Sequence, residues 1–101
     1  MGPIIINAIV LQEDGMWIAQ CLEYNLVSCA ETLAELPGEL MRQVKSQIEA
    51  DESAGKRPFF AYKPAAPKYW AMFEEAKLRS TPILPAQSVP SVQAQLFQVA
   101  A

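Results

Sequence analysis

Residues 4–21, IIINAIVLQEDGMWIAQC, decide the fold, because they encode two strands joined by a tight turn. Residues 4–13 are rich in β-branched side chains, which favour an extended backbone. Asp14-Gly15 follows, a strong two-residue hairpin signal, since glycine accepts a positive φ without steric cost. We therefore predict an antiparallel pair with Glu13 opposite Met16 and a second strand over residues 16–23.

Both faces of this predicted pair are apolar. A sheet with one solvated face would alternate more cleanly between apolar and polar residues. One helix covers one face, so the other face needs a second helix, the C-terminal tail or another subunit. The predicted faces carry Ile4, Ile6, Ala8, Val10, Trp17, Ala19 and Cys21 on one side, and Ile5, Ile9, Leu11, Ile18 and Leu22 on the other.

A short third strand is predicted over residues 26–30, with Tyr24-Asn25 as the centre of the turn, because asparagine tolerates the left-handed region. A two-residue turn there places Cys21 and Cys29 on opposite faces of the sheet. A three-residue loop would change that parity and bring the two thiols close together. We predict no disulfide.

A long helix follows the third strand. Thr32 and Glu35 have the spacing of a capping box, and the helix runs to about Ser53, where Gly55 closes it. The proline of Pro37-Gly38 removes a backbone donor, so we expect an irregular first turn and a regular helix from about residue 37. The apolar stripe of this helix consists of Leu33, Leu36, Leu40, Val44 and Ile48.

The sequence after the long helix predicts a second helix followed by a tail. Pro67 suits the first position of a helix with aromatic residues on its apolar side. Residues 80–101 are uncharged, and the pattern around Val92 and Leu96 fits either a strand or a helix face. We predict a single domain over residues 1–79 and a tail over residues 80–101 that packs on its own domain or on a neighbouring subunit. The fold class is α+β: a three-stranded antiparallel sheet packed by a long helix, plus a shorter C-terminal helix and a packing tail.

The composition excludes several kinds of chemistry. The 101 residues include no histidine and two cysteines, so histidine-dependent triads and four-thiolate zinc sites are impossible. The four glycines form no phosphate-binding motif. We predict no catalytic, cofactor-binding or metal-ligating residue and no enzymatic activity; a cysteine-dependent enzyme is the weakest alternative.

No apolar run approaches the roughly 20 residues of a membrane-spanning helix, and the N-terminus lacks the pattern of a secretory signal. We therefore expect a cytoplasmic protein with reduced thiols and no membrane partner.

Charge is distributed unevenly along the chain. Residues 1–55 carry nine acidic and two basic side chains, residues 56–79 carry six basic and two acidic ones, and residues 80–101 carry none. An acidic half argues against nucleic acid, which binds clustered lysine and arginine. This uneven charge has two interpretations. It is either an ordinary scatter of charged surface residues or an acidic face that binds a basic partner, since complementary charge orients association.

Residues 13–21, Leu26 and residues 30–35 together resemble the HicB-like antitoxin family. Asp14-Gly15 match its acidic-glycine turn, Trp17 and Ala19 match its second strand, and Thr32 matches its helix cap. The resemblance covers residues 3–53. It implies a β-β-β-α core related to a truncated ribonuclease-H-like fold, an oligomer, no catalysis, and a small basic RNA-cleaving toxin as partner.

The function predicted from the sequence is a non-enzymatic protein–protein interaction module of HicB-like type that neutralises a small basic toxin. The alternative is an orphan homo-oligomeric domain without a toxin. In either case we expect a dimer or tetramer and no cofactor. The predicted interface residues are Trp17, Tyr69, Trp70, Phe73, Val92, Leu96 and Phe97.

Overall fold

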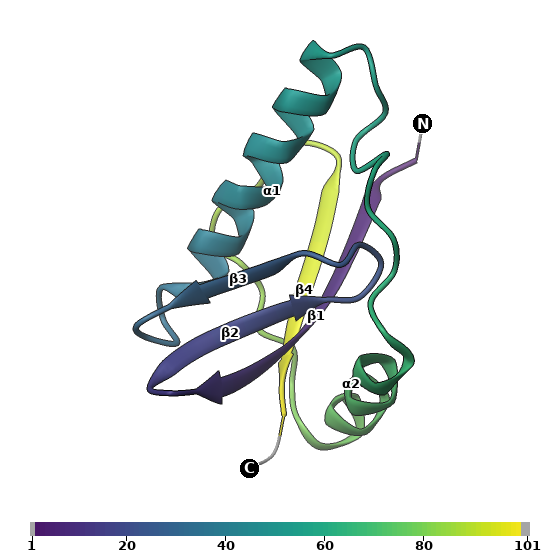
Figure 1. The fold of residues 1–101 in the computed structure, drawn as a ribbon. Coiled ribbons are helices and arrows are strands. Elements are labelled where there is room, and N and C mark those ends of the chain that lie inside the picture. Colours follow the sequence, from purple (N-terminus) through teal and green to yellow (C-terminus); the bar gives the residue numbers. More distant parts are fainter. Residues whose placement is uncertain (1, 100–101) are drawn as a thin grey trace.

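The computed structural model describes residues 2–99, which form one four-stranded sheet and two helices (Figure 1). The sheet order is β3-β2-β1-β4. The α+β class is confirmed, but the predicted three-stranded antiparallel sheet is wrong, because β4 adds a parallel strand beside β1. The elements in chain order are β1 (Ile4–Glu13), β2 (Met16–Cys21), β3 (Val27–Ala30), α1 (Leu36–Ser53), α2 (Pro67–Arg79) and β4 (Val92–Gln98).

The β1–β2 hairpin has the predicted turn and register. Glu13 lies opposite Met16, and the pairing continues to Ala8 opposite Cys21. Asp14 and Gly15 both have positive φ, at 48° and 79°. A turn with two positive φ angles matches the right-handed twist of the flanking strands, which explains why Asp-Gly is placed here.

The β2–β3 connection is longer than predicted. Trp17 lies opposite Ala30, two positions away from the register that a two-residue turn at Tyr24-Asn25 requires. Residues 22–26 form the connection instead, and the side-chain amide of Gln20 donates to Asn25 Oδ1 at 2.8 Å. A shift of two positions preserves the face of every side chain, so Cys21 and Cys29 lie on opposite faces, as predicted.

Helix α1 begins after the irregular first turn that the proline predicts. The Thr32 hydroxyl donates to the Glu35 carboxylate at 2.7 Å and accepts the Glu35 backbone N–H at 3.2 Å. The helix itself begins at Leu36, with Pro37 in its first turn. It ends at Ser53, and Gly55 follows with a φ of 74°.

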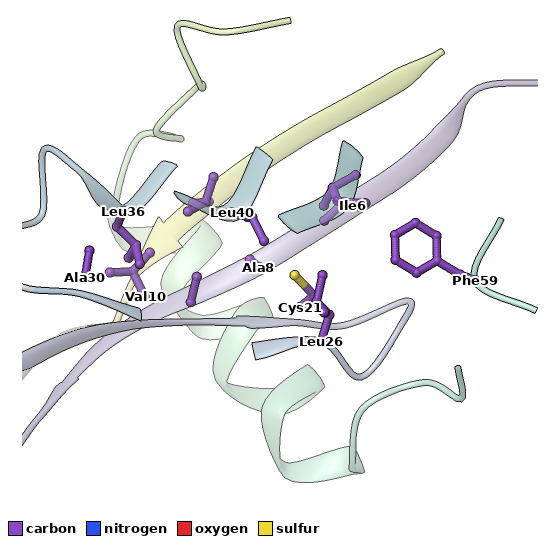
Figure 2. Close-up of a cluster of buried hydrophobic side chains, with 12 residues drawn as sticks. Ile6, Ala8, Val10, Cys21, Leu26, Ala30, Leu36, Leu40 and Phe59 are labelled. Carbon is purple, nitrogen blue, oxygen red and sulfur yellow. The ribbon is translucent and has the colours of Figure 1, made fainter. Parts of the chain in front are cut away.

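One face of the sheet packs against α1 and forms the larger core. Figure 2 shows side chains of β1 directed toward Leu36 and Leu40 of the helix, with Cys21 and Phe59 at the other end of the cluster. Because side chains alternate between the two faces along a strand, the members of this core that belong to β1 and β2 all point to the same face of the sheet. The buried members of this core are Ile6, Ala8, Val10, Ala19, Cys21, Leu26, Ala30, Leu36, Leu40, Val44, Phe59 and Leu96.

Helix α2 covers part of the opposite face. It packs on β1 and β4, where the rings of Phe73 and Phe97 meet edge to face with centroids 5.4 Å apart. Ile9, Leu22 and Ala76 complete this second, smaller core. The sheet is therefore the middle layer between two helices of unequal length (Figure 1).

The predicted tail supplies β4, which pairs in parallel with β1 from Ile4 opposite Val92 to Val10 opposite Gln98. The strand alternative of the sequence pattern is thus the one that forms. Ahead of it, Ile83 and Leu96 exchange two backbone hydrogen bonds of 2.7 and 3.0 Å on the outer side of β4. The tail packs on its own domain here; its last two residues lie outside the described range.

Candidate interaction surface

The seven predicted interface residues lie on two opposite faces of the sheet. Trp17, Val92 and Leu96 belong to the core beneath α1, whereas the others belong to the core beneath α2. Leu96, Phe97 and Phe73 are buried within the chain itself. The predicted residues that retain exposed surface are Trp17, Tyr69, Trp70 and Val92.

Four exposed carboxylates lie at one end of the molecule. Glu13 and Asp14 are at the β1–β2 turn, and Glu31 directly follows β3. These segments meet at the same end because Trp17, near the start of β2, pairs with Ala30, the last residue of β3 (Figure 1). With Glu35, which precedes α1, the carboxylates of Glu13, Asp14 and Glu31 form a surface that we call the acidic end.

Within residues 2–99, no lysine or arginine forms an ion pair with a carboxylate of the acidic end. The ion pairs found within residues 2–99 join Arg42 to Glu39 and two lysine or arginine side chains of α2 to glutamates on the same helix. Carboxylates near a helix N-terminus are also stabilised by its dipole, which accounts in part for Glu35. The remaining charge attracts basic groups and speeds their encounter.

Trp17 lies on β2 at the acidic end, opposite Ala30 of β3 and Gln12 of β1. Its side chain packs against the core beneath α1 but remains partly exposed. A tryptophan held by a core and bordered by charge is a typical anchor of a protein interface. Its place at the same end of the sheet as the four carboxylates was not apparent from the sequence, because it depends on the pairing of β2 with β3.

Two other carboxylates have structural roles. Glu23 accepts hydrogen bonds from the backbone N–H of Asn7 at 2.7 Å and from its side-chain amide at 2.6 Å. Asp51 is buried and accepts from the backbone N–H of Phe59 at 2.7 Å and from Gln47 Nε2 at 2.9 Å. Both groups are satisfied within the chain, so neither contributes to a binding surface.

The two thiols differ in exposure and chemistry. Cys21 is buried on the α1 side of the sheet, and Cys29 is exposed on the α2 side. Burial, with a smaller contribution from the Glu23 carboxylate, raises the pKa of Cys21 to about 12. A thiol that stays protonated at neutral pH is a poor nucleophile, so Cys21 acts as a core side chain.

Thiol labelling checks this assignment. In dilute native protein near neutral pH, we expect one thiol to react rapidly and the other to react only on unfolding. Cys29→Ser should abolish the rapid reaction, whereas Cys21→Ser should retain it. Rapid labelling of Cys21 in the folded protein would contradict its burial and reopen the cysteine-enzyme alternative.

A cleft of about 690 Å³ opens beneath the C-terminal half of α1. Ile4, Ile48 and Phe59 contribute to its lining, which also includes Lys45, Arg57, Glu49 and Glu52. Its volume is in the range of small-molecule sites. The two cationic and two acidic side chains balance, so the cleft has no net charge that would select an anionic or a cationic ligand.

The described residues contain no cluster of three or more acidic or cysteine side chains arranged to hold a metal ion. Neither α1 nor α2 combines the length and the apolar composition that a bilayer span requires. Comparisons of the chain with protein-family models, with curated proteins and with solved structures gave no match.

Proposed function

We propose that the protein is a non-enzymatic interaction module of HicB-like type, whose acidic end binds a small basic protein such as the toxin of a toxin–antitoxin pair. The observation that carries the proposal is the group of four exposed carboxylates, none of them in an ion pair within residues 2–99, at the same end of the sheet as the partly exposed Trp17. Charge would steer the basic partner, and the indole would supply apolar contact area.

Two further features support this proposal. The order β1, β2, β3, α1 agrees with the β-β-β-α core that the sequence resemblance implies. The buried, protonated thiol of Cys21 leaves that side chain without nucleophilic character. Both features favour binding over catalysis.

The test is affinity purification from the native host with the whole chain as bait, followed by identification of small basic proteins. The variant Asp14→Asn/Glu35→Gln removes two charges from the acidic end while keeping the turn geometry and the acceptor for Thr32. We expect it to bind the partner about tenfold more weakly, because long-range attraction is lost.

The matched control is Glu49→Gln/Glu52→Gln, which makes the same change of net charge at exposed positions near the other end of α1. Binding should be unchanged in this variant. Equal weakening by both variants would show a general effect of net charge, and recovery of no small basic protein would remove the proposed partner.

A further inference from the structure

The cleft beneath the C-terminal half of α1 is bounded by segments that lie far apart in the chain. Its walls come from the start of β1, the second half of α1, the connector that follows this helix and the turn that precedes β4 (Figure 1). The first and last strands are joined here, because Ile4 donates its backbone N–H to the Ser91 carbonyl at 2.7 Å. Concave sites of this size are the usual places for small ligands.

Backbone strain is concentrated at this cleft. Within residues 2–99, the residues other than glycine that have a positive φ are Asp14, Phe59 and Ser91. Asp14 belongs to the hairpin turn, which requires this conformation, whereas Phe59 at 60° and Ser91 at 65° both line the cleft. Such conformations are unfavourable for residues with a side chain, above all for a bulky aromatic one. Strained positions cluster at ligand sites, so the strain found here indicates a role beyond packing.

A hydrogen-bond network holds the strained wall in place. Buried Asp51 accepts the backbone N–H of Phe59 and the side-chain amide of Gln47, and Gln47 accepts the hydroxyl of Tyr62 at 3.0 Å. The ring of Tyr24 stacks on Phe59 with centroids 4.5 Å apart, and Tyr62 meets Phe59 edge to face at 5.4 Å. Tyr24 and Tyr62 remain partly exposed. The cleft therefore has a preformed aromatic wall on which a flat apolar group can pack.

Four exposed, charged side chains line the same cleft: the cations Lys45 and Arg57 and the carboxylates Glu49 and Glu52. In the described part of the chain, none of them forms an ion pair with another of the four or with any other residue. A ligand with a single charge would be attracted by two of these groups and repelled by the other two. A ligand with one positive and one negative charge can pair with both kinds.

We propose that this cleft binds a small zwitterion with an aromatic body, of which a free aromatic α-amino acid is the simplest form. The ring packs on the wall that Tyr24 and Tyr62 present, the carboxylate pairs with the two cations, and the ammonium group pairs with the two carboxylates. The cleft is separate from the acidic end, because Glu35 precedes the first turn of α1 and the cleft lies beneath the opposite half of that helix.

Calorimetry on the purified full chain with a series of small probes tests the ligand class. Phenylalanine should bind with a dissociation constant in the millimolar range or below, as expected for a ligand of this size. Phenethylamine lacks the carboxylate, 3-phenylpropanoate lacks the ammonium group, glycine lacks the ring and N-acetylphenylalaninamide lacks both charges. Each of these four should bind about tenfold more weakly or worse. Absence of phenylalanine binding, or equal affinity for phenylalanine and any of the four analogues, would overturn the proposal.

Variants of exposed cations locate the site. Lys45→Gln/Arg57→Gln should weaken phenylalanine binding about tenfold without weakening phenethylamine, which has no carboxylate to lose a partner. The matched control, Lys63→Gln/Lys68→Gln, makes the same change of net charge at exposed positions outside the cleft lining. It should bind phenylalanine as the unaltered chain does. Equal weakening by the two variants would show an effect of net charge alone and contradict a site in the cleft.

Glu49→Gln/Glu52→Gln separates this site from the proposed protein interface. The variant removes the partners of the ammonium group, so its affinity for phenylalanine should fall about tenfold, with circular dichroism to verify the fold. It leaves the acidic end intact and should still bind the basic partner. An unchanged affinity for phenylalanine would overturn the cleft proposal and leave the interface standing, whereas loss of the basic partner would count against the interface alone.

Discussion

Replacing Leu96 by alanine is expected to lower the free energy of unfolding by about 3 kcal/mol, the usual cost of a cavity at a fully buried leucine. Leu96 is completely inaccessible to solvent, lies on β4 and belongs to the core beneath α1. A cavity there removes contacts with residues of the N-terminal strands as well as those of the tail. Chemical denaturation monitored by tryptophan fluorescence measures the loss.

Leu84→Ala is the matched control for this experiment, because it makes the same substitution in the same uncharged segment. Leu84 is largely exposed, so its replacement should change the free energy of unfolding by less than about 0.5 kcal/mol. If Leu96→Ala cost as little as Leu84→Ala, the C-terminal strand would not belong to the cooperative core.

The second large effect is expected at Asp51. Asp51→Ala removes the acceptor for the Phe59 backbone N–H and for the Gln47 amide, and it leaves the buried N–H of Phe59 without a partner. Such a loss costs about 2–3 kcal/mol. Phe59 has a φ of 60°, a strained value for a bulky side chain, and the bond from Asp51 helps to hold it there.

Asp51→Asn retains one carbonyl acceptor for Phe59, so it should cost about 1 kcal/mol, distinctly less than the alanine variant. Glu52→Ala, at the exposed neighbouring position, should have almost no effect. Thermal unfolding of the three variants provides the comparison. Equal stabilities for Asp51→Ala and Glu52→Ala would show that the carboxylate does not secure the connector.

These experiments and the binding experiments address separate parts of the molecule. Leu96 and Asp51 lie in or beside the core beneath α1, whereas the acidic end is an exposed surface. Variants at the surfaces are therefore expected to preserve the fold. A loss of partner binding in those variants can then be attributed to the changed surface rather than to unfolding.

The candidate surface was only partly predictable from sequence. The excess of acidic residues in the N-terminal half and the choice of Trp17 as an interface residue are expectations from the sequence that direct attention to this region. The predicted interface set also included Leu96, Phe97 and Phe73, which the structure buries. An aromatic or aliphatic pattern has the same appearance in a sequence whether it faces a partner or the chain's own core.

The sequence by itself determined the elements whose signals are local. Asp14-Gly15 specified the hairpin and its register, and the proline of Pro37-Gly38 specified the irregular start of α1, because each depends on backbone preferences of a few adjacent residues. The length of α1 was predictable from the helical spacing of its apolar residues and from Gly55, which follows its last turn.

Only the tertiary structure decided the features that depend on residues far apart in the chain. The parallel pairing of β4 with β1, the shifted register of β3 and the hydrogen bonds of Asp51 each require a partner that no local pattern identifies. Pairing between distant segments is determined by the packing of the whole core, so it becomes visible only when the chain is folded.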